Sequence, residues 1–243
     1  MGRTFRSIVT GGNTGIGAAI ARQLIARGHE VLCLSRRKPD WSDAKLGFVE
    51  VDLMDAAATK QAAQEILRGG PVTHIVHNAG VIRAKPLEDV HLDDLAALSQ
   101  LHLGAAIELA QAALPGMKAA RFGRIVLISS RAAMGLQTRT VYSATKAGMI
   151  GMARTWALEL APHGVTVNVV SPGPIGDTEM FESVMSPESE RARALAKSIP
   201  VGRLGRSADV ARAVDFFCDE AADFVTGQTL LVCGGASIGA LSM

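Results

Sequence analysis

The chain has 243 residues, of which 48% are hydrophobic and 20% are charged, and its formal net charge is +2 at pH 7. This composition supplies a buried core for one large domain and excludes a chain that is mainly disordered. The 25 Lys and Arg and the 23 Asp and Glu are scattered, apart from a basic run at residues 36–38, so we expect no nucleic-acid partner.

Short runs rich in Val and Ile alternate with longer stretches of helical period, which is typical of a parallel sheet covered on both faces. Strands are predicted at residues 7–10, 30–34, 48–52, 74–77, 124–129, 166–171 and 229–232. Helices are predicted near residues 16–27, 56–68, 92–118, 141–161 and 207–221. The sequence therefore predicts an α/β fold, a single domain over residues 1–243 with a doubly wound seven-stranded parallel sheet and helices on both faces.

Residues 173–200 are polar, contain several prolines and are long for a connection within a compact domain. They form either a lid with short helices of its own or a disordered excursion, and we favour a lid over a ligand.

The three cysteines, Cys33, Cys218 and Cys233, are odd in number and lack CxxC spacing, so we expect reduced thiols and no metal site. The first β-like run begins at residue 7, too early for a cleavable signal. Residues 224–243 carry no charge, but glycines and polar residues interrupt them, so they predict no membrane anchor. We expect a cytoplasmic protein with no membrane partner.

A glycine-rich loop directly follows the first strand and opens the first helix. Glycines allow the backbone to turn tightly beside a pyrophosphate, and the free N–H groups of a helix start favour its negative charge. With the second strand, the loop completes the βαβ context that a dinucleotide site requires. The loop residues are Thr10, Gly11, Gly12, Asn13, Thr14, Gly15, Ile16 and Gly17.

The end of the second strand carries no carboxylate for the adenosine ribose of NAD, since the sequence there is Leu34, Ser35, Arg36, Arg37. A hydroxyl and two guanidinium groups suit a 2′-phosphate, so NADP(H) is the preferred cofactor and NAD(H) is possible. The alternative is that Arg36 and Arg37 form a solvated surface pair.

Tyr142, the one tyrosine of the chain, stands four residues before Lys146 in a predicted helix, so the two share a face. A nearby ammonium brings the pKa of a phenol toward working pH, which makes the pair a candidate acid and base. Ser130, at the end of the strand near residue 129, is a candidate second donor to the same substrate oxygen. Taken alone, the Tyr–Lys spacing is more typical of a helix-surface pair.

These residues, in this order, resemble the classical short-chain dehydrogenase/reductase family, and the resemblance covers essentially the whole chain. It is carried by the glycine loop, by Asp52-Leu53, Asn78-Ala79-Gly80, Ile128-Ser129-Ser130 and Tyr142-Ser143-Ala144-Thr145-Lys146, by residues 168–175 and 200–205, and by Thr226-Gly227-Gln228.

The resemblance implies a Rossmann fold with Tyr142 as general acid/base and Ser130 orienting the substrate oxygen. Lys146 is implied to lower the pKa of Tyr142 and to bind the nicotinamide ribose. It also implies a set of cofactor contacts: Asp52 and Leu53 at the adenine, Asn78, Ala79 and Gly80 along the cleft, and Pro172, Gly173, Ile175 and Thr178 at the nicotinamide.

The chain departs from the family pattern at several positions. His102 replaces a catalytic asparagine that relays protons through water; histidine either keeps the relay with a new pH dependence near neutrality or does not relay. Cys233 replaces an acidic residue, which we interpret as structural. Gly176-Asp177 lengthens the segment before Thr178 by one residue, and the spacing from Ser130 to Tyr142 is one residue short.

The leading prediction is an NADP(H)-dependent oxidoreductase that interconverts a secondary alcohol, or a diol, and its ketone. The alternative within enzymes is a β-ketoacyl-acyl carrier protein reductase, although His163 stands where those reductases often place an arginine. An alternative of another class is a cofactor-binding protein with little catalysis. The family is usually tetrameric or dimeric, which implies a homo-oligomer, with the helix at 141–161 and the helix at 207–221 with its following strand as interfaces.

Overall fold

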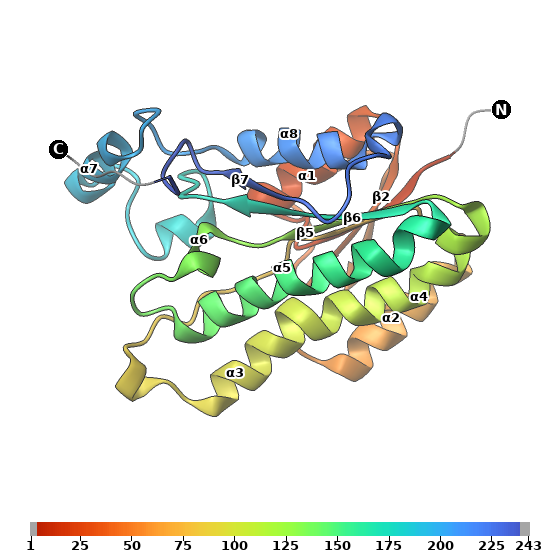
Figure 1. Cartoon of the computed structure of the whole chain (residues 1–243), viewed down its shortest axis with the longest axis horizontal. Coiled ribbons are helices and arrows are strands. Elements are labelled where there is room, and N and C mark those ends of the chain that lie inside the picture. Colours follow the sequence, from red (N-terminus) through yellow and green to blue (C-terminus); the bar gives the residue numbers. More distant parts are fainter. Residues whose placement is uncertain (1–3, 239–243) are drawn as a thin grey trace.

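The computed structural model describes residues 4–238. Within them, seven strands pair in parallel in one sheet of order β3-β2-β1-β4-β5-β6-β7 (Figure 1). The predicted α/β class and doubly wound sheet are therefore confirmed. The strands are β1 (Arg6–Thr10), β2 (Glu30–Ser35), β3 (Leu46–Glu50), β4 (His74–His77), β5 (Gly123–Ile128), β6 (Val165–Pro172) and β7 (Thr229–Val232).

Helices cover both faces of the sheet (Figure 1). On one face, α1 (Gly15–Ala26) and α8 (Ser207–Cys218) pack against each other and against the sheet. On the other face lie α2 (Ala56–Arg68), α4 (Ala105–Ala120) and α5 (Thr140–Leu160). Successive side chains of a strand enter opposite cores, as Val169 and Val170 of β6 do, which explains why these strands are apolar throughout.

The stretch predicted as one helix over 92–118 is interrupted. It consists of α3 (Leu92–Ser99), a π-helical turn η2 (Gln100–Gly104) and α4. A π-helical turn shifts the side chains that follow it around the helix axis, and such turns are frequent at functional sites. His102 lies within this turn and is fully buried.

The segment 173–200 carries two short helices, α6 (Glu179–Glu182) and α7 (Glu190–Ser198). Side chains start both helices, because Thr178 Oγ1 accepts from the N–H of Phe181 and Ser189 Oγ from that of Ala192. Its base is tied to the start of α8, where Asp177 Oδ1 accepts from the backbone N–H of Ser207 at 2.8 Å and from its hydroxyl at 2.9 Å. Short 3₁₀ turns are η1 (Leu87–Asp89), η3 (Arg131–Met134), η4 (Ala161–His163) and η5 (Glu220–Ala222).

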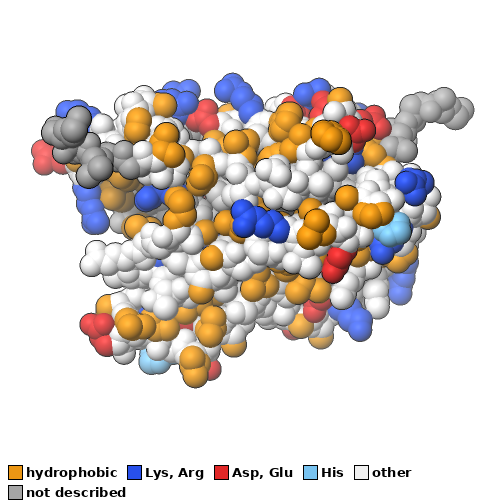
Figure 2. Space-filling model, viewed as in Figure 1, with side chains coloured by type: hydrophobic (Ala, Val, Ile, Leu, Met, Phe, Trp, Pro, Cys, Tyr) orange, Lys and Arg blue, Asp and Glu red, His pale blue; other side chains and the backbone are white. Residues whose placement is uncertain are grey.

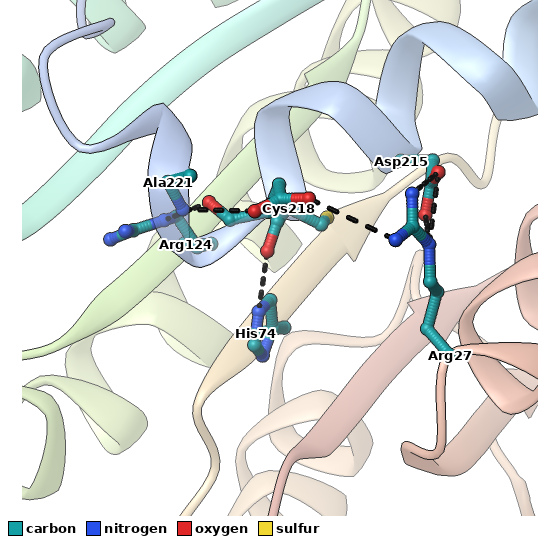
Figure 3. Close-up of polar contacts among 7 residues, drawn as sticks. Arg27, His74, Arg124, Asp215, Cys218 and Ala221 are labelled. Atoms are coloured by element: carbon teal, nitrogen blue, oxygen red, sulfur yellow. Dashed lines mark hydrogen bonds and ion pairs between the residues drawn. The ribbon is translucent and has the colours of Figure 1, made fainter. Parts of the chain in front are cut away.

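The end of α8 is fixed to the amino-terminal edge of the sheet (Figure 3). His74, the first residue of β4, contacts the carbonyl oxygen of Cys218 through Nε2 at 3.1 Å. Arg27 pairs with Asp215 at 2.7 Å. The buried Arg124 donates from Nε to the carbonyl oxygen of Asp219 at 3.2 Å. These bonds leave the opposite, carboxyl edge of the sheet to the loops.

Charges of both signs are interspersed on the molecular face drawn in Figure 2, with no stripe of one sign. Within residues 4–238, no helix combines the length and the apolar character that crossing a bilayer requires.

Candidate active site

A cleft of about 570 Å³ opens at the carboxyl edge of the sheet, where doubly wound folds place their ligands. Its walls come from the glycine loop, from the loops after β2, β3 and β4, and from the helix α6. The predicted cofactor residues that line it are Gly11, Asn13, Thr14, Gly15, Ile16, Ser35, Arg36, Arg37, Asp52, Leu53, Asn78, Ala79, Gly80 and Thr178.

The glycine loop turns back on the first turn of α1. Gly11 has a φ of 62°, in the left-handed region that glycine adopts without strain. A Cβ on Gly17 would overlap the carbonyl oxygen of Gly11, so only glycine permits this close approach. The result is a helix start that presents its N–H groups to the cleft, an arrangement suited to a pyrophosphate.

A chain of buried hydrogen bonds fixes this loop to the neighbouring strand. Thr10 Oγ1 accepts from the backbone N–H groups of Asn78 and Ala79, each at 2.9 Å, and contacts His77 Nδ1 at 3.1 Å. Because both lone pairs of Thr10 Oγ1 are used, its hydroxyl proton goes to Nδ1. His77 Nε2 then donates to the carbonyl oxygen of Leu101 at 3.0 Å. The loop after β4, the glycine loop and the π-helical turn are thus held together.

The cleft ends in a basic wall where the adenosine ribose is expected. The Ser35 hydroxyl donates to the carbonyl oxygen of Arg37 at 2.7 Å and stabilises that turn. Arg37 pairs with Glu179 of α6 at 2.6 Å, and Arg36 is exposed without a side-chain partner among the described residues. The third strand ends at Glu50 rather than at the predicted residue 52, so Asp52 lies in a loop, where its Oδ1 accepts from a backbone N–H.

The three predicted catalytic side chains meet beside this cleft. Ser130 lies close enough to Tyr142 to lower the pKa of its phenol, and its Oγ accepts from the N–H of Ala132 at 3.1 Å. Lys146 Nζ donates to the carbonyl oxygen of Ile128 at 2.7 Å and lies 5.7 Å from the centre of the Tyr142 ring. The preceding serine, Ser129, is instead buried and donates to the backbone oxygen of Lys146 at 2.7 Å, which supports the choice of Ser130.

The electrostatics of the pair differ from the prediction. Burial raises the pKa of Tyr142 above its usual value, against the lowering effects of Ser130 and Arg139. Burial also lowers the pKa of Lys146 to about 7. Lys146 is not among the groups that shift the pKa of Tyr142, and its ammonium is directed to the strand β5.

His102 is held as a neutral imidazole. Its Nδ1 lies 2.8 Å from Thr145 Oγ1, whose own proton points to the carbonyl oxygens of Val141 and Tyr142. Nδ1 is therefore the donor, and Nε2 is a bare acceptor with no hydrogen-bond partner among residues 4–238. Burial and then the Lys146 charge hold the pKa of His102 far below its ordinary value, which counts against the alternative of a titration near neutrality.

Some predicted cofactor residues do not line the cleft. Thr10 and Gly17 lie behind the loop that they shape, as described above. Ile175 is buried in the core shared by α1 and α8, and Gly173 lies against Cys233. Pro172 ends β6.

Cys233 is buried and lies 3.1 Å from Ser237 Oγ. Burial raises its pKa, but the Ser237 hydroxyl and backbone N–H groups outweigh that effect and leave the pKa below its ordinary value.

Two contributors to the site escaped sequence reasoning. In the sequence, His77 is the last residue of a buried strand. A polar side chain at a strand end is the signal that could have indicated its role. Glu179 lies 142 residues from Arg37 in the chain, so no local pattern joins them.

The comparisons with known proteins define the family. The family model described as enoyl-(acyl carrier protein) reductase matches residues 11–237. The chain belongs to the short-chain dehydrogenase/reductase family, as its motifs predicted.

Individual relatives match along nearly their whole length. The chain is 39% identical over 235 residues to the 3-oxoacyl-(acyl-carrier-protein) reductase MabA of Mycobacterium avium, covering 96% of this chain and 89% of that protein. It is 35% identical over 237 residues to the 3-oxoacyl-(acyl-carrier-protein) reductase FabG of Salmonella typhimurium, covering 94% and 96%. A blue fluorescent protein from a metagenomic library, solved in complex with NADPH, has a TM-score of 0.83 at 32% identity, covering 96% of this chain and 98% of that chain.

Proposed function

We propose that this protein is an NADP(H)-dependent oxidoreductase that interconverts a secondary alcohol, or a diol, and the corresponding ketone. The observation that carries the proposal is the meeting of Ser130, Tyr142 and Lys146 beside a glycine-loop cleft whose far wall is basic. The family and the NADPH complex of a structural relative support the same conclusion.

The cleft fits the dinucleotide by its donors. Gly17 leaves room for the loop to present backbone N–H groups, and Arg36 and Arg37 offer guanidinium groups in place of a carboxylate. This donor set favours the 2′-phosphate of NADP(H). NAD(H) would need a carboxylate for its adenosine ribose, and residues 34–37 at the end of β2 include no acidic residue. The cofactor, when bound, supplies the hydride.

The protein's own groups hold and protonate the substrate oxygen. Because its pKa is raised, Tyr142 is protonated at neutral pH and is ready to act as a general acid toward a carbonyl oxygen. Ser130 supplies the second hydrogen bond to that oxygen. Lys146 binds the nicotinamide ribose, and the segment 173–200 covers the substrate. Alcohol oxidation uses the same groups with the proton moving the other way.

His102 completes the polar path behind Tyr142. A Cβ on Gly80 would stand 3.0 Å from His102 Nε2 and 3.4 Å from Lys146 Nζ, so both nitrogens border the same small space. The bare Nε2 is an acceptor for the ammonium or for a water beside it. We therefore assign His102 the relay role of the family's asparagine, without a titration of its own.

Reduction of β-ketoacyl groups on an acyl carrier protein is the second candidate. The names of the MabA and FabG relatives favour it. His163 in place of an arginine near the end of α5 counts against a basic docking face. A mobility shift with an acidic carrier protein would separate it from the leading proposal, and cofactor binding without any turnover would favour the non-catalytic alternative.

We further propose a cytoplasmic homo-oligomer. Hydrophobic side chains reach the surface on the face in Figure 2, and the exposed ones on α5, α8 and their following segments include Leu158, Phe216 and Phe224, the last fully exposed. Three free, buried cysteines suit a reducing compartment. Light scattering at several protein concentrations tests for a dimer or a tetramer.

The test of the function pairs binding with turnover. Purified protein is titrated with NADPH and NADH, and a ketone panel is assayed with wild type and Tyr142→Phe, for which we expect a loss of about 10²- to 10⁴-fold in kcat. Arg36→Ala should weaken NADPH more than NADH, whereas Arg68→Ala, on the exposed end of α2, should change neither. Equal turnover by Tyr142→Phe would refute the mechanism.

A further inference from the structure

The segment between Ser130 and Tyr142 ends in a guanidinium that has no counter-ion in the described part of the chain. Arg139 immediately precedes α5, three residues before Tyr142. Its Nη1 donates to Thr138, at 2.6 Å to the hydroxyl and at 3.3 Å to the carbonyl oxygen. Its Nε is buried, and no acceptor within residues 4–238 meets it. An unpaired, buried N–H is costly, so an acceptor supplied by a ligand at this position would be favourable.

The loop that follows β4 faces this segment, and its two cations, Arg83 and Lys85, are paired. Arg83 Nη1 lies 2.7 Å from Asp94 Oδ1, and Lys85 Nζ lies 2.9 Å from Asp94 Oδ2. The two loops touch, since the N–H of Lys85 donates to the carbonyl oxygen of Thr138 at 3.0 Å. Both carboxylate oxygens of Asp94 are therefore engaged by Arg83 and Lys85. Asp94 does not pair with Arg139, whose guanidinium is available to a ligand.

Arg139 is placed beside the reacting end of the site. Arg139 stands at the start of the helix that carries Tyr142, within one helical turn of it along the chain. The charge of Arg139 reaches the phenol, since it lowers the pKa of Tyr142 against the effect of burial. Thr138, which holds the guanidinium, has a φ of 63°, a left-handed conformation that is strained for a β-branched residue and is typical of functional sites.

The geometry points to Arg139 as the residue that selects substrates bearing a carboxylate or a phosphate close to the reacting carbonyl. This inference rests on the proposed function, because it requires Tyr142 to meet the carbonyl oxygen. An anionic oxygen satisfies the buried Nε–H with a charge-assisted hydrogen bond, and a neutral ketone offers no such acceptor at that position. The substrate class is therefore an oxo acid or hydroxy acid, or a phosphorylated ketone or alcohol.

Matched substrate pairs test this selectivity. Oxo acids with the ketone at carbon 2, 3 or 4, counted from the carboxyl carbon, are compared with their methyl esters. Dihydroxyacetone phosphate is compared with dihydroxyacetone, and all assays use NADPH. We expect wild type to prefer the anion in at least one pair, and Arg139→Gln to lower kcat/KM for that anion by about 10- to 100-fold, mainly through KM. Its neutral partner should be little affected. Arg139→Lys should restore part of the preference, and Arg154→Gln, at an exposed position of α5, should not change it.

The outcomes separate this inference from the proposed function. An equal loss on both members of a pair would show that Arg139 acts on Tyr142 alone, and an absence of preference in every pair would also overturn the inference while ketone turnover remained. If no compound is turned over, the same compounds are titrated into the enzyme–NADPH complex, followed by NADPH fluorescence. Arg139-dependent binding of the anions then supports the inference and counts against the proposed function alone, whereas equal binding overturns the inference.

Discussion

Removing the hydroxyl of Thr10 tests the link between the glycine loop and β4. Thr10→Val keeps the shape of the side chain but deletes the acceptor of two backbone N–H groups, those of Asn78 and Ala79. Thr10 is fully buried, so water cannot replace the acceptor readily. Each unsatisfied N–H costs about 1–3 kcal/mol, which gives a loss of roughly 2–6 kcal/mol in the free energy of unfolding.

Thr59→Val is the matched control. Thr59 is also fully buried, and its hydroxyl donates to the carbonyl oxygen of Asp55 at 2.7 Å. That carbonyl oxygen keeps a second partner, the N–H of Thr59 at 2.9 Å, so no group is left unpaired. The control should lose only about 0.5–1.5 kcal/mol.

Urea unfolding of both variants, followed by circular dichroism at one protein concentration, measures the difference, and the NADPH KM reports on the loop. We expect the KM to rise for Thr10→Val and not for Thr59→Val. A Thr10→Val protein no less stable than the control, with an unchanged NADPH KM, would refute the view that this hydroxyl fixes the loop.

Two further predictions concern the serine pair and the buried histidine. Ser130→Ala should lower kcat by about 10²- to 10³-fold with little change in stability, whereas Ser129→Ala should lower the free energy of unfolding by about 0.5–1.5 kcal/mol; steady-state kinetics and urea unfolding of both variants would expose the opposite pattern. Burial lowers the pKa of His77 to about 3, so between there and about 6.5 the unfolded chain binds a proton that the folded chain does not. Stability should therefore fall by up to about 1.4 kcal/mol per pH unit from this residue as pH drops through that window, and unfolding curves of His77→Gln should show a shallower fall; an equally steep fall would contradict this assignment.

The sheet could be predicted because its central strands are buried on both faces and read as continuous apolar runs. The third strand was placed two residues late at its end because β3 is an edge strand, paired only with β2, and none of its side chains is fully buried. The π-helical turn around His102 could not be predicted, since a shift of one residue is hidden within a long apolar helix. The helices α6 and α7 are short and polar, and their main signals in the sequence are the capping residues Thr178 and Ser189.

The candidate site could be predicted as far as residue identity goes. The spacing of Tyr142 and Lys146 placed them on one helix face, but the direction of their pKa shifts depends on burial, which spacing does not reveal. The neutrality of His102 depends in the same way on Thr145, which lies across the core in another helix. Loop contacts such as that between Lys85 and Thr138 arise from the topology of the fold. The sequence around Arg139 therefore did not indicate that this residue lies near the candidate site.

The ion pair between Arg37 and Glu179 links two properties that could otherwise change separately in evolution, the cofactor preference and the position of α6. Arg37 belongs to the wall that suits the 2′-phosphate, while Glu179 belongs to the helix that covers the cleft. A mutation that changes residue 37 to favour the other dinucleotide also removes an ion pair to this helix. Divergence of cofactor preference in this lineage is therefore expected to be accompanied by change at position 179.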